Sequence, residues 1–388
     1  MSLKLQIKRG TAAEIANYTG AAGELVFATD TKQLFCMDGV AKGGYLMSDF
    51  RTEDVSCYTP QFLEADTASG RTYIKVHAGT HIRISNGGSP VYYSANQDVS
   101  FDVKSILDTG NSLANAKDYY IYAVTDGANN QRLVCSLNST YPAGYTAETS
   151  RKIGGFHTLC VSVGTGLTYY RNGAQLNHAL NGYEAGDILP ASVWCLKHRP
   201  YCSPEGMVYE PETNMWVDIY LQSGTGTSTA SIYGATVTDT RYPQAHMNDM
   251  LRVHKRLLDE ETFTAAAQGS NEQTAISGAK DWGTTGGHVD TNNRRMISNI
   301  GCEDMCGFMW QWFEGSAQGP VGGSGWANYG TYKNDNWGGS SYGTPYWLLG
   351  GGNWNDGSSC GPLSRSANDG RGSLIVYNGG RGASPNIH

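Results

Sequence analysis

Tryptophan and glycine crowd the C-terminal part of this chain. Six of the nine tryptophans follow Gly301, and glycines are frequent between them. Such a segment forms few regular elements, because glycine inside a helix or strand loses more conformational entropy on folding than any other residue. Large rigid aromatic side chains must then supply the core, although stacking on a carbohydrate is the alternative role for any one of them. The expected core tryptophans are Trp310, Trp312, Trp326, Trp337, Trp347 and Trp354.

Length and charge narrow the possibilities further. A chain of 388 residues is too long for one ordinary core and predicts two or three domains. Its 24 tyrosines and 50 glycines favour β-rich, loop-rich folding. The formal net charge of -7 argues against binding to nucleic acid, which requires a basic surface. No apolar stretch has the length of a secretory signal or a membrane span, so we expect no membrane insertion.

The nine cysteines lack the spacing of a disulfide framework, and their odd number is typical of a protein made in a reducing cytoplasm. Cys302 and Cys306 are the closest pair, but no second pair or neighbouring histidines complete a zinc site. We expect buried thiols here, and we expect neither a metal nor another cofactor.

Residues 1–49 contain short strands separated by turns. Apolar and polar residues alternate over 3–8, which predicts a half-buried strand, and residues 9–11 are expected to turn. Two more strands are expected at 24–28 and 33–37. So few residues cannot bury a core alone, so we expect this unit to pair with other copies of itself in a homo-oligomer.

Residues 50–190 also alternate between short strands and turns. Apolar, β-branched and aromatic residues gather at 72–77, 119–124 and 132–135. Several strands at this spacing predict a β-sandwich. No pattern of reactive side chains occurs among them, so we interpret the stretch as a spacer or platform.

Two helices are expected after residue 190, at 244–254 and 259–268. Asp259 is a suitable N-cap, followed by two glutamates that favour the positive end of a helix. Gly269 is a suitable stop. Residues 191–388 therefore predict an α+β domain attached to a mainly β chain.

The last residues of the chain are unusual in what they omit. Residues 1–333 contain 12 Lys, 14 Glu, 12 Gln and 10 Met, whereas residues 334–388 contain none of these four types. Gly-, Ser- and Asn-rich loops exclude long side chains in general, and that is one explanation. The other is genetic: randomising the adenines of Asn codons of the form AAC leaves NNC codons, which never encode Lys, Glu, Gln, Met or Trp. Trp354 would then be a constant position.

Serine, glycine, asparagine and tyrosine are also the residues from which antibody loops build contact surfaces. We therefore expect a ligand-binding face within 353–378, on a backbone held by glycines. Arg365, Arg371 and Arg381 are expected to be structural and to bind loop carbonyls and carboxylates. The candidate ligand-binding residues are Asn353, Asn355, Asp356, Ser358, Ser359, Leu363, Ser364, Ser366, Asn368, Asp369, Ser373, Ile375, Tyr377 and Asn378.

Several motifs occur in an order that one family shares. They include Arg9-Gly10-Thr11-Ala12-Ala13-Glu14, Arg151-Lys152-Ile153-Gly154-Gly155-Phe156-His157, Lys197-His198-Arg199-Pro200, Trp216-Val217-Asp218-Ile219-Tyr220-Leu221, Gly351-Gly352-Asn353-Trp354-Asn355 and Gly379-Gly380-Arg381-Gly382. Residues 3–39 are similar to the N-terminal repeat of phage tail-fibre proteins. Nearly end to end, the chain resembles the major-tropism-determinant-like variable proteins of phage diversity-generating retroelements.

This resemblance implies an architecture and a role. Residues 1–49 would form a β-prism, 50–190 a β-sandwich, and 191–388 a C-type lectin fold of the formylglycine-generating-enzyme-like subtype, with a variable region at about 353–378. Three chains would assemble at the tip of a tail fibre on the virion. Expected partners are other phage tail proteins and a host bacterial surface receptor, protein or glycan. The residues matching positions near those the family varies are Asn353, Asn355, Ser358, Asn368, Ser373, Ile375, Tyr377 and Asn378. The spacing between Arg365 and Gly379 differs from the family pattern.

Enzymes with the same lectin fold are the first alternative. One class needs a reactive cysteine pair near the C-terminus, where this chain has only Cys360, and the other needs an iron-binding His/His/Glu motif that is absent from the sequence. We therefore expect no catalytic residues. Two further alternatives are a structural tail-fibre cap without a receptor and a variable protein displayed on a bacterium.

Overall fold

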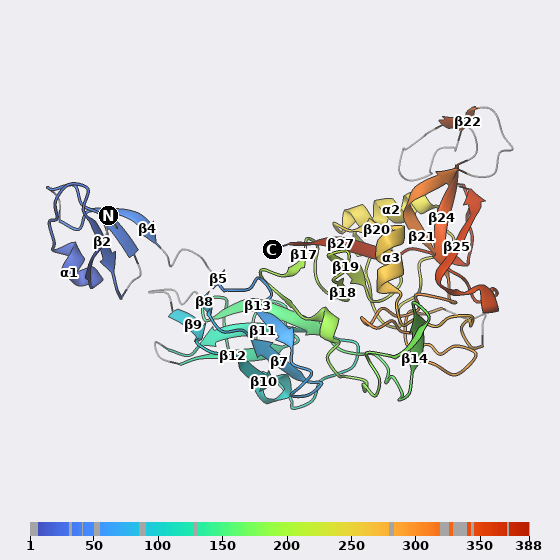
Figure 1. The fold of residues 1–388 in the computed structure, drawn as a ribbon, viewed down its shortest axis with the longest axis horizontal. Helices are drawn as coiled ribbons and strands as arrows, with labels where there is room; N and C mark the ends of the chain where they lie inside the picture. The colour runs from blue at the N-terminus through green and yellow to red at the C-terminus, as the bar shows by residue number, and fades with distance from the viewer. Residues whose placement is uncertain are drawn as a thin grey trace.

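The computed structural model describes residues 7–30, 33–40, 42–49, 55–84, 91–127, 130–278, 283–318, 326–328, 340–342, 345–370 and 372–387. It is mainly β with few helices, as predicted. Figure 1 shows the N-terminal strands at one end of the long axis and strands β24 (Pro345–Gly351) and β25 (Gly361–Gly370) at the other. None of the helices in these ranges is long and apolar enough to cross a membrane.

The N-terminal unit is one four-stranded sheet with a short helix. Its elements are β1 (Lys8–Gly10), α1 (Ala12–Ala16), β2 (Leu25–Ala28), β3 (Gln33–Cys36) and β4 (Tyr45–Asp49), and the strand order is β1-β2-β3-β4. The strands predicted at 24–28 and 33–37 are confirmed as β2 and β3. The strand predicted over 3–8 falls largely outside the described residues, since these begin at Ile7.

The turn predicted at 9–11 is wrong. Arg9 and Gly10 lie in β1, which pairs in parallel with β2, and Thr11 is the N-cap of α1. The Thr11 hydroxyl accepts from the Glu14 amide at 3.3 Å, and the Glu14 carboxylate accepts from the Thr11 amide at 2.7 Å. This reciprocal pair is a capping box, which satisfies two backbone donors at once and so starts a helix where a turn was expected.

Three sheets make up the middle of the chain, with strand orders β10-β7-β6, β5-β8-β9 and β12-β11-β13-β16. The predicted strands at 72–77, 119–124 and 132–135 are confirmed as β7, β11 and β12. One hydrophobic cluster, which includes Val55, Ile74, Ile82 and Ile121, draws residues from all three sheets. The elements are β5 (Val55–Ser56), β6 (Leu63–Ala65), β7 (Tyr73–Val76), β8 (Thr80–Ile84), β9 (Val91–Ala95), β10 (Val99–Asp102), η1 (Val103–Ile106), β11 (Asp118–Thr125), β12 (Gln131–Ser136), β13 (Ser150–His157) and β16 (Trp194–Cys195).

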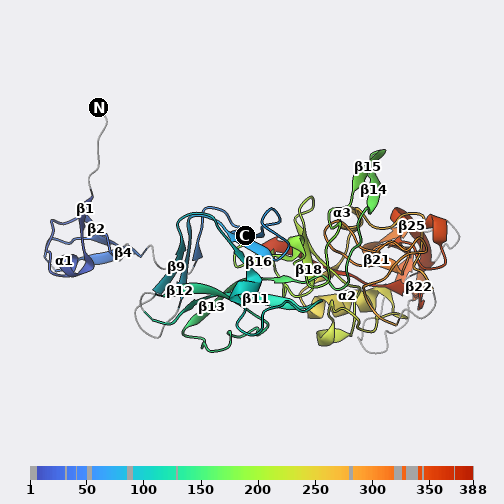
Figure 2. The ribbon, with the colours of Figure 1, turned by 90° about the horizontal axis from the view of Figure 1, so that it is seen from below.

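A two-stranded hairpin, β14 (Thr168–Arg171) and β15 (Ala174–Asn177), lies between β13 and β16 in the chain and projects from the molecule (Figure 2). The short 3-10 helix η2 (Pro190–Ser192) then leads into β16. The sheet β12-β11-β13-β16 therefore extends to Cys195, where β16 pairs with β13.

Two larger sheets and two helices form the C-terminal part. The first sheet has the strand order β17-β27-β19-β18, with β20 also paired to β27, and the second has the order β25-β24-β21-β26. Both predicted helices are present, and the Asp259 carboxylate caps α3 by accepting from the Thr262 amide at 2.7 Å. The elements are β17 (Arg199–Pro200), β18 (Met207–Glu210), β19 (Met215–Asp218), η3 (Gly226–Ser228), α2 (Pro243–Arg252), β20 (Arg256–Leu257), α3 (Glu260–Ala266), β21 (Trp310–Gln318), β22 (Trp326–Asn328), β23 (Ser340–Tyr342), β24 (Pro345–Gly351), η4 (Gly357–Ser359), β25 (Gly361–Gly370), β26 (Asn378–Gly379) and β27 (Gly382–Ile387).

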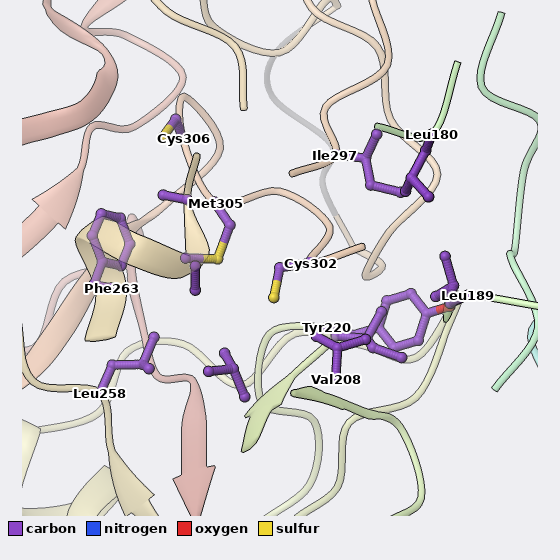
Figure 3. Close-up of a cluster of buried hydrophobic side chains, with 14 of the residues drawn as sticks. Leu180, Leu189, Val208, Tyr220, Leu258, Phe263, Ile297, Cys302, Met305 and Cys306 are labelled. Atoms are coloured by element: carbon purple, nitrogen blue, oxygen red, sulfur yellow. The ribbon is translucent and has the colours of Figure 1, made fainter. Parts of the chain in front are cut away.

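Side chains from loops as well as strands fill the core of this part. Figure 3 shows Phe263 of α3 and Tyr220 on either side of Met305 and Cys302. Cys302 and Cys306 are fully buried, which confirms the expected buried thiols. Trp312, Trp347 and Trp354 are buried as predicted and Trp310 is partly buried, whereas the side chains of Trp326 and Trp337 lie outside the described residues.

Arg381 is the largest charged side chain in this interior, and none of it is exposed. Its Nη1 donates to the carbonyls of Asp218 and Ile219 at 2.8 and 2.7 Å. Nη2 donates to the Glu303 carbonyl at 2.6 Å, and Nε donates to Gln311 Oε1 at 2.8 Å. Burial lowers the pKa of Arg381. Its predicted structural role is confirmed, because four acceptors from three separate segments converge on one guanidinium.

Replacing Arg381 with methionine should therefore destabilise the protein by roughly 3–5 kcal/mol, since buried carbonyls would lose their donors. Guanidinium chloride unfolding measures the change. Arg171→Met is the matched control, because Arg171 forms an exposed ion pair with Glu212 and its loss should leave stability nearly unchanged. Equal stability of the two variants would contradict the role assigned to Arg381.

Candidate binding face

The segment 353–378 contributes both edge strands of one sheet in the C-terminal part. It leaves β24, turns through η4, returns as β25 along one edge of the sheet, and ends in β26 at the opposite edge. β24 and β21 are the two central strands, so the chain between β25 and β26 passes from one edge to the other. Figure 1 shows this region at the end of the molecule farthest from the N-terminal sheet.

A tight turn begins the segment. Gly351 and Gly352 have φ values of 96° and 84°, a left-handed conformation that other residues rarely adopt. The Asn353 side-chain oxygen then accepts from the backbone N–H of Asn355 at 2.7 Å. The Asp356 carboxylate accepts from the backbone N–H of Asn353, also at 2.7 Å. Asn353 is only 6% exposed. The Asn353 side chain therefore stabilises the turn from a buried position.

The far end of the segment is tied in a similar way. Asn378 is fully buried, and its Nδ2 donates to the Asp369 carboxylate at 2.9 Å. β26 pairs in parallel with β21, so that Asn378 lies beside Trp310. The Asp369 contact joins the end of β25 to β26 across the sheet.

Arg365 holds the middle of the segment. Its guanidinium donates to Glu260 Oε1 at 2.9 Å and to Thr264 Oγ1 at 2.6 Å, and these contacts connect β25 to α3. The same group lies 5.4 and 5.2 Å from the ring centroids of Phe263 and Phe313. The predicted structural role of Arg365 is confirmed, and Arg371 lies outside the described residues.

Tyr377 contributes to the core as well as to the face. Its ring lies edge-on to Trp354 at 5.9 Å and packs against the cluster that contains Phe308 and Met309. Burial raises the pKa of Tyr377, and the carboxylates of Asp369 and Asp356 raise it further. This tyrosine is therefore half-buried beneath the surface rather than projecting from it.

The candidate residues fall into three classes of exposure. Asn353 and Asn378 are buried. Seven are half-buried, namely Asp356, Ser364, Ser366, Asp369, Ser373, Ile375 and Tyr377. The five exposed candidates are Asn355, Ser358, Ser359, Leu363 and Asn368.

Sequence reasoning left out four exposed residues of the same segment. Leu374 is 49% exposed, Val376 is 47% exposed, and Ala367 and Gly372 are exposed as well. Residues 372–377 alternate between exposed and half-buried, and Ile375 and Tyr377 fall on the inner positions. The sequence could not show this alternation, because residues 374–377 are all apolar, and only the tertiary structure determines which of them point outward.

The cysteine of this segment, Cys360, offers little reactivity. Cys360 is 3% exposed, and burial, together with the neighbouring Asp356, raises the pKa of its thiol to about 12. A thiol with so high a pKa is a poor nucleophile at neutral pH. Within the described ranges, no three His, Cys, Asp or Glu side chains are grouped so that they could hold a metal ion.

Comparisons with known proteins cover nearly the whole chain. Two family models match: the major tropism determinant N-terminal domain over residues 5–41 and the Mtd second domain over residues 64–195. The tail fiber receptor-binding protein of Bordetella phage BPP-1 is 28% identical over 415 residues, and the alignment covers 98% of each chain. Solved structures of the U1 and I1 variants of the major tropism determinant match with TM-scores of 0.72 and 0.73, at 26% and 25% identity, over 99% of this chain and 100% of theirs.

The inner and outer positions near the end of the segment should differ in their effect on stability. Tyr377→Ala should destabilise the protein by roughly 1–3 kcal/mol, because it removes a ring packed on Trp354 and the cluster below. Val376→Ala, next in the chain and half in solvent, is the control and should change stability little. Chemical denaturation measures both, and a larger loss for Val376→Ala would contradict the orientation described above.

Proposed function

Because this chain is a major-tropism-determinant-like protein, we propose that it is a phage tail-fibre protein that binds a receptor on the surface of a bacterial host. The observation that carries the proposal is the exposed set of small polar and aliphatic side chains on 353–378, at the end of the molecule opposite the N-terminal sheet. A tail fibre needs an attachment end and a recognition end, and these positions suit the two roles. The proposed location is the fibre tip of the virion, and the receptor is a protein or a glycan.

We propose three domains with different tasks. Residues 1–49 are the β-prism that joins the fibre, 50–190 the β-sandwich spacer, and 191–388 a C-type lectin fold of the formylglycine-generating-enzyme-like subtype. The N-terminal sheet has a hydrophobic cluster of its own, which supports its separation from the rest of the chain. One further cluster is centred on the middle sheets, whereas two others join residues of 120–189 to residues after 200, so the second and third domains would share a buried interface. The role is binding rather than catalysis, in agreement with the high pKa of Cys360 and with the receptor-binding relative.

We also propose that residues on 353–378 are diversified through NNC codons by a retroelement. The absence of Lys, Glu, Gln and Met after Lys333 supports this origin. The fold can accommodate such exchange, because Asn355, Ser358, Ser359, Leu363 and Asn368 are exposed and their side chains fill no core. Surface substitutions of this kind usually change stability by less than about 0.5 kcal/mol.

Assembly as a homotrimer would raise the affinity for the receptor, because three binding faces would be linked. In the N-terminal sheet, Leu25 pairs with Cys36 and Phe27 with Leu34, so these four apolar side chains lie on one face and all are half-exposed. The opposite face packs Val26 and Ala28 against Ile15 of α1. A unit with so small a core gains stability when other copies cover its second face, and three linked binding faces gain affinity through a high effective concentration.

Adsorption of phage particles to the infected strain tests the receptor-binding role. Leu363 is 78% exposed, so Leu363→Asp should leave folding intact while lowering the adsorption rate about tenfold or more, because the loss repeats in every copy. Leu137→Asp is the control, since Leu137 is 49% exposed at a site far along the chain from the face. Unchanged adsorption after replacement of Leu363 and Asn368 together would refute the proposed face.

Sedimentation at micromolar concentration tests the trimer. The native chain should sediment with the mass of three chains, and Leu34→Asp should shift it to single chains, because a carboxylate would be buried between copies without a partner. Val40→Asp in the same unit is the control, as Val40 is 84% exposed. A native protein that sediments as a single chain would overturn this part of the proposal.

A further inference from the structure

We propose that a pocket outside segment 353–378 binds an oxyanion, the carboxylate or phosphate group of a charged sugar. The pocket has a volume of about 200 Å³ and is lined by the loop 163–168 and the turn 293–295. Pockets for drug-sized ligands occupy about 300–1,000 Å³, so this one suits a single small group. That the sugar belongs to a host surface rests on the receptor-binding function proposed above, whereas the binding chemistry depends on the pocket alone.

The loop 163–168 is held at both ends and leaves its middle amides unpaired. The Val163 N–H donates to a carbonyl of the stretch 181–183 at 2.8 Å, and the Leu167 N–H donates to a side-chain oxygen of the same stretch at 2.9 Å. The N–H groups of residues 164–166 have no acceptor within the described part of the chain. Successive free N–H groups in a turn form a concave site for an anion.

The turn 293–295 supplies a partly exposed guanidinium. Arg294 Nε donates to the Asp290 carboxylate at 2.9 Å, and Nη2 donates to Thr274 Oγ1 at 3.0 Å. Nη1 has no partner among the described residues, and the side chain is 33% exposed. The free N–H groups of Nη1 are therefore accessible to a ligand.

Arg295 contributes a second unpaired donor. The residue is 8% exposed, its Nη2 donates to Glu303 Oε1 at 2.6 Å, and its Nη1 donates to the His288 carbonyl. Its Nε is buried and has no hydrogen-bond partner in the described ranges. A buried donor without an acceptor costs free energy, and an oxyanion in the pocket that Arg295 lines would supply one.

The groups that line the pocket favour an anion over a cation. Of the residues that the structure describes, no aspartate or glutamate lines it, so a cation would meet no opposite charge at the wall. Its unpaired polar groups on Arg294, Arg295 and residues 164–166 are N–H donors, which bind charged oxygens more strongly than neutral ones. Both guanidiniums are already paired with carboxylates, so we expect a dissociation constant on the order of 1–10 mM.

One intervening loop connects the pocket to segment 353–378. Arg294 Nη2 donates to the Glu272 carbonyl at 3.4 Å, and the next residue, Gln273, donates its N–H to the Cys360 carbonyl at 2.8 Å. A sugar in the pocket would therefore lie near the proposed binding face while being held by residues outside it.

Saturation-transfer-difference NMR on the full chain tests the site with glucuronate, inorganic phosphate and glucose as probes. At least one of the two anions should bind, and the stronger one identifies the oxyanion. Glucose should bind about tenfold more weakly or less, because it lacks the charge. Equal binding of glucose would overturn the anion assignment. No binding of either anion at about 50 mM, well above the expected dissociation constant, would overturn the site.

A pair of variants at position 164 localises the binding and separates charge from bulk. A Cβ on Gly164 would meet no atom within 4 Å, so both variants should fold and melt as the native protein does. Gly164→Asp should weaken anion binding about tenfold or more through repulsion between like charges. Gly164→Asn has the same size without the charge and should keep most of the affinity. Unchanged affinity in both variants, or an equal loss in both, would contradict the proposed site.

Adsorption separates this inference from the proposed function. Phage particles with Gly164→Asp should adsorb more slowly than particles with Gly164→Asn, and equal rates would overturn the link to a host sugar. If the probes do not bind, the oxyanion site fails, and Leu363→Asp still tests the receptor-binding face. If Leu363→Asp leaves adsorption unchanged while the probes bind, the receptor-binding face fails and the oxyanion site stands.

Discussion

The guanidinium group of Arg381 is the contact on which the rest of the C-terminal part depends. It binds carbonyls that follow β19 and precede β21, together with a side chain of β21 itself. Gly382 adds a backbone hydrogen bond to the Asp218 carboxylate at 3.0 Å, and Lys255 pairs with the same carboxylate at 2.5 Å. A buried guanidinium is tolerated only when its N–H donors have acceptors. This network therefore determines where β27 and the end of segment 353–378 lie.

The proposed binding face benefits from this arrangement. Asn378, at its end, is only a few residues from Arg381, and its start follows two glycines whose φ values bend the chain beside Cys360. Stability thus resides in the buried network, in Arg365 and in the aromatic pair Trp354 and Tyr377. The outward side chains take no part in these contacts, which is the physical condition for changing specificity without unfolding the protein.

Local chemistry explains which elements could be predicted. The apolar run at 119–124 and the N-cap Asp259 carry their signal within a few residues, and both elements formed as expected. The helix after Thr11 was missed although its Thr-x-x-Glu pattern is visible, because a one-and-a-half-turn helix offers no periodicity to support the cap. The binding face within 353–378 stays a prediction from the sequence, which could not tell exposed from buried positions of the same residue type, such as Asn368 and Asn378.

The sequence by itself determined the residue types available at the C-terminus, the mainly β character of the chain and the family to which its motifs point. These are properties of composition and local order. Only the tertiary structure decided that Asn353 and Asn378 face inward while Leu374 and Val376 face outward. Burial depends on which surface the chain crosses between β25 and β26, and that surface is assembled from β21 and β24, which lie elsewhere in the sequence.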